Sequence, residues 1–127
     1  MVHAIRSSKS LPEIDKAIRS AAQRHKFGVL NVLDIDQTLR NKGIDLNRAC
    51  CGYDVCNPQA ASTALGHDMK VSTVLPCRIS VFAEGDKFVL ATVKPTDLMK
   101  ATGLNGVEDL ANEIEREIFA IMDEAAG

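Results

Sequence analysis

The sequence predicts an α+β fold in which helices pack on one face of a mainly antiparallel sheet. Two stretches, within residues 11–25 and 107–125, carry apolar residues at helical spacing, and each needs a surface against which to bury its stripe. Two further apolar segments, 78–83 and 87–93, are separated by Glu84-Gly85-Asp86 and resemble a β-hairpin. The helices and the hairpin therefore share one core in this prediction.

The first half of the chain alternates strands with helices. Residues 2–7 are rich in apolar and β-branched side chains and predict a strand. Ser10-Leu11-Pro12-Glu13 forms a capping box, in which Ser10 and Glu13 satisfy each other's backbone N–H groups, so the helix over 11–25 begins there. The apolar run 27–35 predicts a second strand, which we expect to be largely buried.

The central part of the chain contains shorter elements. Asp36 is expected to cap a short helical piece that ends at Gly43, and residues 49–55 predict a further strand. Asn57-Pro58 is a strong helix start, because Asn is a favoured cap and Pro tolerates the first helical position. That helix should end at Gly66. The 127 residues fit one domain, 1–127.

Composition narrows the possible partners. The net charge is −2 and the basic residues are scattered, which disfavours binding to nucleic acid or to an anionic membrane. Aromatic residues make up only 4% of the chain, so stacking on bases or sugars is disfavoured too. The first residues lack the apolar core of a signal peptide. We therefore expect a cytoplasmic protein whose thiols are kept reduced.

The four cysteines, Cys50, Cys51, Cys56 and Cys77, are the only strongly reactive groups gathered in one segment. Cys56 precedes the helix start, where the positive end of the helix dipole can lower a thiol pKa and favour the thiolate. The alternative is that Cys56 packs as a small apolar residue. Cys77 follows Pro76 at the start of the hairpin and has the same two interpretations. The spacing contains no C-x-x-C motif and matches no structural zinc pattern.

Other candidate ligands are few. His67 follows Gly66 in an expected loop and, with Met69 and Cys77, could bind a metal or haem iron, although a surface histidine is more often merely solvated. Asp34 and Asp36 are two residues apart, a spacing that more often marks a strand end than an acid–base couple.

Three segments resemble the bacterial and archaeal family named domain of unknown function 302. They are Phe27-Gly28-Val29-Leu30, Cys56-Asn57-Pro58-Gln59-Ala60 and Leu75-Pro76-Cys77-Arg78-Ile79-Ser80-Val81. The resemblance implies a TATA-binding-protein-like α+β fold, usually a homodimer, and no established activity. It places Cys56, Asn57, Pro58, Pro76 and Cys77 in the hallmark segments. Cys50, Cys51 and His67 lie outside that pattern.

Three functions remain open at this point. The first is a small oligomeric binding protein with a site at Cys56, Asn57, Pro76 and Cys77 for a small ligand, metal or haem. The second is a thiol-based redox or sulfur-transfer protein in which Cys56 is the nucleophile and Cys77 resolves it. The third is a structural or interaction protein whose cysteines are buried. No companion catalytic motif accompanies the thiols, which favours the binding protein over an enzyme.

Overall fold

A computed structural model describes residues 1–127 and contains one five-stranded antiparallel sheet. The strand order is β1-β5-β4-β3-β2, so the first two strands of the chain, β1 and β2, form the two edges of the sheet. The strands are β1 (Val2–Ser7), β2 (Gly28–Asp34), β3 (Cys50–Cys56), β4 (Cys77–Glu84) and β5 (Lys87–Val93). The predicted strands and the hairpin of β4 and β5 are confirmed.

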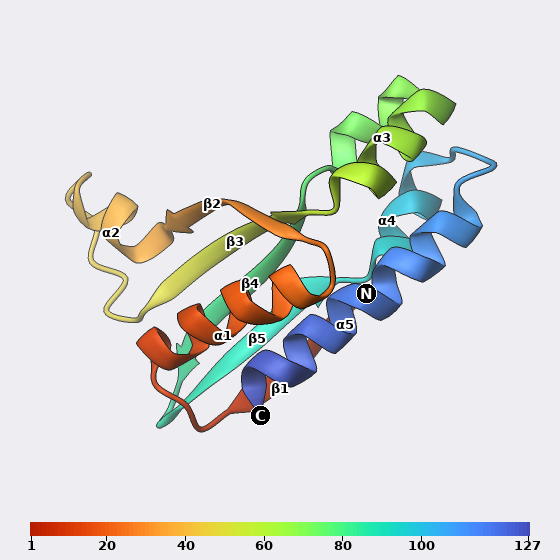
Figure 1. The fold of residues 1–127 in the computed structure, drawn as a ribbon. Helices are drawn as coiled ribbons and strands as arrows, with labels where there is room; N and C mark the ends of the chain where they lie inside the picture. The colour runs from red at the N-terminus through yellow and green to blue at the C-terminus, as the bar shows by residue number, and fades with distance from the viewer.

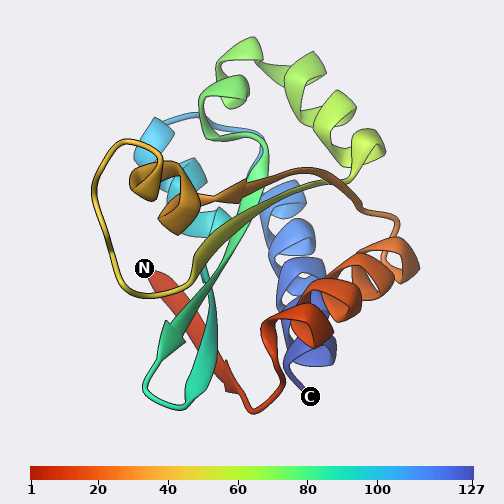
Figure 2. The same ribbon diagram turned by 90° about the vertical axis from the view of Figure 1, so that its left-hand side faces the viewer.

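Helices α1 (Leu11–Arg24) and α5 (Glu108–Ala126) cover the same face of the sheet, as Figures 1 and 2 show. The capping box starts α1 as predicted: the Glu13 N–H donates to Ser10 Oγ, and the Ser10 N–H donates to Glu13 Oε1. The buried positions of α1 are Ile14, Ile18, Ala21 and Ala22, which recur at helical spacing. The predicted α+β class, with helices on one face of an antiparallel sheet, is therefore confirmed.

The buried apolar side chains fall into two clusters of unequal size. The main core joins α1, α5 and the covered sheet face through 15 buried residues, including Ile18, Val81 and Ile118. A satellite core has only three buried residues, Ala64, Val71 and Val107, with half-buried apolar side chains around them.

The satellite core lies beneath three short helices beyond one end of the sheet, on the side where α3 is labelled in Figure 1. These helices are α3 (Pro58–His67), the 3₁₀ helix η1 (Met69–Val74) and α4 (Pro95–Thr102). The sequence analysis predicted α3 but assigned no structure to η1 or α4. The signal for α4 was Pro95, which occupies the first turn of the helix, where its missing N–H has no cost.

Two expectations for the region around β2 are wrong. The apolar run 27–35 is not largely buried, because β2 is an edge strand and exposes side chains such as Leu30, which is 63% exposed. The short helix α2 spans Ile35–Arg40 and is capped by Asp34, not Asp36: the Gln37 N–H donates to Asp34 Oδ1 over 3.1 Å. Sequence periodicity does not reveal which strand becomes an edge, because that depends on pairing with distant segments.

The second face of the sheet carries no layer of helices (Figure 2). Strand pairing places Val2 opposite Val93 and Val89 opposite Phe82 on this face. We call this surface the open face; its exposed or half-buried apolar residues are Val2, Ala4, Leu33, Phe82 and Val93, whereas Val89 and Ala91 on the same face are buried. Across the whole fold, no helix combines the length and apolarity that crossing a membrane requires.

Candidate functional site

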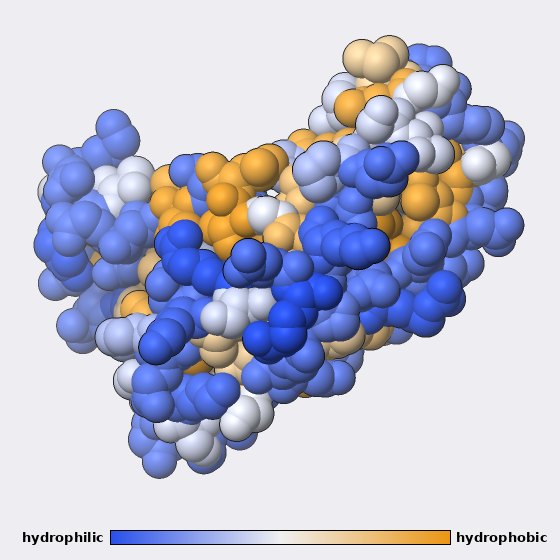
Figure 3. Space-filling model, viewed as in Figure 1, coloured by the Kyte–Doolittle hydropathy of each residue, from blue (hydrophilic) through white to orange (hydrophobic).

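An apolar cavity lies at the boundary between the main core and the satellite core. Its volume is about 50 Å³, and 15 of its 17 lining residues are hydrophobic. Residues of both clusters line it: Phe27, Val55, Cys77 and Ile114 belong to the main core, and Ala64, Val107 and Met99 to the satellite core. Figure 3 shows apolar surface in the gap between α3 and the helices beside it. The lining contains no charged residue and no histidine.

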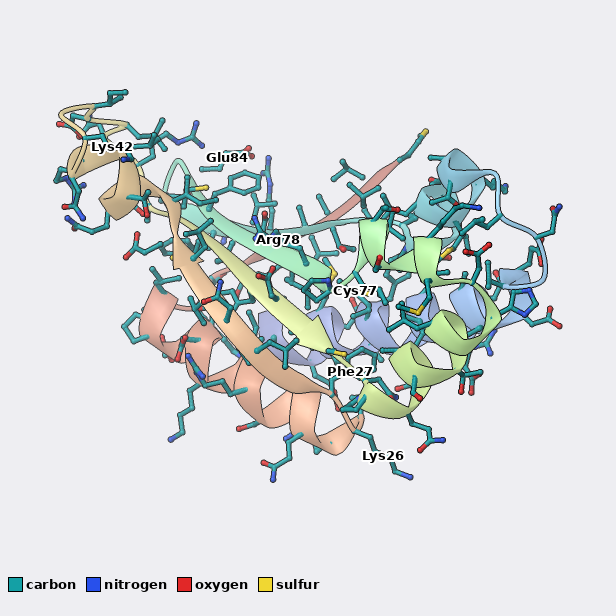
Figure 4. The ribbon with its side chains drawn as sticks, turned by 90° about the horizontal axis from the view of Figure 1, so that it is seen from above. Lys26, Phe27, Lys42, Cys77, Arg78 and Glu84 are labelled. Carbon is teal, nitrogen blue, oxygen red and sulfur yellow. The ribbon has the colours of Figure 1, made fainter.

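Strand pairing brings the two hallmark cysteines to this cavity. β3 ends at Cys56, and its neighbour Val55 is paired with Cys77, the first residue of β4. Both cysteines are half-buried and both line the cavity. Figure 4 shows Cys77 at the start of β4 beside α3, with Phe27 near the same end of the sheet. Two segments that are 21 residues apart in the sequence thus share one site because β3 and β4 are adjacent.

Asn57 supplies the main polar side chain of the cavity. It caps α3 as predicted, since the Ala60 N–H donates to Asn57 Oδ1 over 3.1 Å. Pro58 then occupies the first helical position. Asn57 is part of the cavity lining, and its side-chain amide nitrogen makes no hydrogen bond within the chain. It is therefore a donor that a ligand oxygen can use.

The environment of Cys56 disfavours the thiolate, which was one of the two interpretations that its place before α3 left open. Burial raises the pKa of the Cys56 thiol above its ordinary value. Burial, followed by the nearby Cys56, raises the pKa of Cys77 to about 11. An apolar wall withdraws water from the sulfur and penalises its charged form more than the helix end stabilises it. Both thiols are therefore neutral around neutral pH.

Pro76 and His67 lie outside the cavity lining. Pro76 is exposed and borders a shallow depression with Arg78, Thr92 and Val93. His67 is the last residue of α3, at the opposite end of the helix from Cys56, and its Nε2 donates to the backbone oxygen of Asn105 over 2.9 Å. The structure therefore does not bring His67 to Cys77.

Several cavity residues were not recognised in the sequence. Leu98 and Met99 come from α4, and Leu110, Ala111 and Ile114 come from the first half of α5. The α5 residues were predicted as part of a helical stripe, but nothing indicated that part of this stripe faces a cavity. The signal that could have found Leu98 and Met99 is the helix start at Pro95.

Comparisons with known proteins identify the family and support the overall fold. A family model described as "Domain of unknown function DUF302" matches residues 3–125. The chain belongs to this family. The crystal structure of an uncharacterized conserved DUF302 protein from Bacillus stearothermophilus is similar over 98% of this chain and 97% of that one, with a TM-score of 0.93 and 26% identity. Comparison with curated proteins finds no match.

Proposed function

We propose that this DUF302 protein binds a small, uncharged and mainly apolar molecule in the cavity between the two cores. The observation that carries the proposal is the lining, in which apolar side chains surround a single amide donor. Binding sites for small molecules are commonly concave and apolar, with a few polar groups that fix orientation. The free amide nitrogen of Asn57 would orient a ligand that has one acceptor oxygen.

The two cysteines fit this role as part of the wall. Neutral thiols are small, polarisable and weakly polar, and they pack well against an apolar ligand. The raised pKa values of Cys56 and Cys77 support this role over nucleophilic chemistry. Thiols of this kind remain reduced in the cytosol, where we place the protein.

Haem fits these residues poorly. A cavity of about 50 Å³ is smaller than the engineered cavity of roughly 150 Å³ that holds a benzene molecule. The lining also offers no imidazole ligand and no cationic side chain for the haem propionates. The same absence of charge and histidine disfavours a hard divalent cation.

The mouth of the cavity allows a ligand larger than its resting volume. Leu98, Met99 and Leu110 are only half-buried and lie outside the main core, so their rotamers can change without disturbing it. Methionine in particular adapts its shape at low cost. We therefore expect binding to be accompanied by movement of these side chains.

The test uses xenon and butanone as probes, with binding followed by methyl chemical shifts in NMR spectra. Xenon reports the apolar space, and butanone adds one acceptor oxygen. Both probes should shift the methyl resonances of Leu98, Leu110 and Ile114. Ala61→Leu should abolish these shifts by filling the cavity, whereas the matched change Ala101→Leu at an exposed position of α4 should not.

A further variant tests the polar contact. Asn57→Ser keeps a capping oxygen for α3 but removes the amide, so it should weaken butanone binding and leave xenon binding unchanged. If neither probe shifts the cavity methyl groups of the unmodified protein, the proposal is wrong.

A thiol-based redox or sulfur-transfer role is the second candidate. It is favoured by the position of Cys56 and Cys77 on the wall of one cavity. The redox step would join the two sulfurs in a disulfide and pass two electrons and two protons to an oxidant. Treatment with diamide, followed by mass spectrometry of the peptides, would reveal this pair. A Cys56–Cys77 disulfide that forms readily and reverses with a thiol reductant would favour this candidate over ligand binding.

We also propose that the protein forms a homodimer through the open face. Val2 is 63% exposed and Val93 is 42% exposed, and they are paired neighbours on β1 and β5. The same face carries positive and negative side chains in two ion pairs. Arg78 lies 2.9 Å from Asp54, and Arg6 lies 2.8 Å from Glu84. A surface with apolar residues and both charges can complement a second copy of itself about a two-fold axis.

Sedimentation equilibrium tests the dimer. The unmodified protein should sediment as a dimer at micromolar concentration, and Val93→Asp should convert it to a monomer. Met69→Asp is the matched control, because Met69 is 69% exposed but lies on η1, away from the open face. A monomeric unmodified protein would contradict the dimer without affecting the ligand proposal.

A further inference from the structure

A second group of side chains, distant from the cavity, lies where β2, α2 and β3 meet. It consists of Asp34 at the end of β2, Asp36 in the first turn of α2 and Cys51 on β3. One ligand atom from each, a carboxylate oxygen or the sulfur, lies within 4.8 Å of the other two. Pairing of β2 with β3 places Asp34 directly opposite Cys51, so their side chains share a face of the sheet.

Local hydrogen bonds hold the two carboxylates in place. Asp34 Oδ1 accepts from the Gln37 N–H over 3.1 Å, and Asp36 Oδ1 accepts from the Cys50 N–H over 3.0 Å. The other oxygen of Asp36 is 3.6 Å from Arg40, a half-exposed side chain that can turn into solvent. No N–H group of the chain donates to the second oxygen of Asp34. The carboxylates thus keep lone pairs free for a ligand.

Cys51 distinguishes this group from an ordinary cluster of surface carboxylates. It is only 6% exposed, and its thiol makes no hydrogen bond although two carboxylates lie beside it. The three side chains converge from two strands and a helix, so a cation between them would receive one sulfur and two carboxylate oxygens at once. Because the two carboxylates repel each other at this distance, the positive charge of such a cation would also be favourable there.

We propose that Asp34, Asp36 and Cys51 form a binding site for a zinc-like divalent cation. One sulfur and two carboxylate oxygens suit a borderline cation, since Mg²⁺ and Ca²⁺ prefer oxygen ligands only. A tetrahedral zinc ion would hold these atoms about 3.5 Å apart, so each pair of atoms needs to approach by about 1.3 Å at most. Asp34 is exposed, which leaves a fourth position for water.

Binding exchanges one proton for one metal ion. The Cys51 S–H bond breaks, the proton passes to the buffer, and the sulfur lone pair forms the bond to the metal. No electron is transferred. The bound ion would tie α2 to the edge of the sheet.

The experiment titrates the complete protein with Co²⁺ as a spectroscopic probe and then adds Zn²⁺. We expect an ultraviolet band from sulfur-to-cobalt charge transfer, which Zn²⁺ should remove by displacing cobalt. Cys51→Ser should abolish the band. Asp34→Asn and Asp36→Asn should each weaken binding at least about tenfold, while the amide oxygen keeps the cap of α2 and the contact to the Cys50 N–H.

Matched variants separate this site from the other thiols and carboxylates. Cys50→Ser changes the adjacent cysteine, Cys56→Ser and Cys77→Ser change those of the cavity, and Asp54→Asn changes a carboxylate elsewhere on β3. All four should keep the band. Thermal unfolding of each variant without metal shows that it is folded, and Asp34→Asn at an exposed position tests the site even if Cys51→Ser is unstable.

Three results would overturn the proposal. One is a charge-transfer band that survives Cys51→Ser, and another is a band lost in Cys56→Ser or Cys77→Ser, which would place the metal in the cavity. The third is binding of Ca²⁺ as tight as that of Zn²⁺, because a site that uses the sulfur should prefer zinc.

Discussion

The main core and the satellite core are built from similar aliphatic side chains but differ in how completely they are enclosed. The main core has a sheet on one side and two long helices on the other, and it buries 15 residues. The satellite core buries three residues beneath short helices that have no sheet behind them. The cavity lies where the two meet. The contrast separates the part of the molecule that supplies most of the stability from the less enclosed part, which in our proposal adjusts to a ligand.

The largest expected effect comes from a cavity created in the main core. Ile118→Ala removes a side chain that is fully buried, which should lower the free energy of unfolding by about 2–5 kcal/mol. Val71→Ala, at an equally buried position of the satellite core, removes less apolar volume and should cost about 1.6 kcal/mol. Urea denaturation followed by circular dichroism measures both values.

Hydrogen exchange sharpens the same comparison. Amides of β4 and β5 should exchange only through global unfolding, whereas amides of α3 should exchange through local opening with a lower free energy. Val71→Ala should then speed exchange in α3 and leave β4 unchanged. Equal protection of α3 and β4 would show that the two cores unfold as one unit, and the proposed division would be wrong.

A smaller effect is expected at the loop that closes the satellite core. Gly106 has a φ of +85°, and a Cβ atom added there would overlap the ring of His67. Gly106→Ala should therefore destabilise the protein by about 1–3 kcal/mol. Gly66→Ala is the matched control, because it lies in α3 with open space around it and should stabilise the helix by up to about 1 kcal/mol.

The double variant Gly106→Ala/His67→Ala separates the two causes at this loop. It should recover the part of the loss that comes from overlap with the ring and leave the part that comes from the backbone angle. Thermal unfolding of the unmodified protein, the two single variants and the double variant measures both contributions. If Gly106→Ala and Gly66→Ala had the same effect, the loop would not be packed against α3 as described.

The sequence predicts the main core better than the satellite core. Helical spacing in α1 and α5 and alternation in β4 and β5 are local patterns, and they predicted the main core correctly. The satellite core depends on η1 and α4, which are too short to show a convincing period. Asn57-Pro58 predicted the start of α3, but which side chains of α4 would face it follows from tertiary packing alone.

The candidate site shows the same limit. Shared location of Cys56 and Cys77 was a sound expectation, because both stand at the ends of elements that the sequence identified. Their protonation was not predictable, since the pKa depends on burial in a cavity whose far wall is α4 and α5. The Asp34–Cys51 neighbourhood was missed because it needs the register of β2 against β3.

The smallest expected effect is a pH dependence confined to the main core. His25 ends α1 and contacts α5 through both ring nitrogens, with Nδ1 2.5 Å from Glu117 and Nε2 2.8 Å from Glu124, which also lies 3.6 Å from Arg24. Burial lowers the pKa of His25, but the hydrogen bonds with the two carboxylates outweigh it and raise the pKa above its ordinary value. The protonated ring can donate to both carboxylates, whereas the neutral ring has a single N–H.

The sign of this pH dependence follows from the raised pKa. A group that binds its proton more tightly in the folded state stabilises the protein fully below its unfolded pKa of about 6.5, and the contribution is lost as the pH rises through the folded pKa. His25→Gln should therefore lower the melting temperature more at about pH 5.5 than at about pH 9. His67→Gln is the control, because the only hydrogen bond of the His67 ring is to a backbone oxygen near the satellite core and involves no carboxylate. A melting temperature of His25→Gln that follows the unmodified protein in parallel across this range would show that the His25 contacts do not hold α1 to α5 through charge.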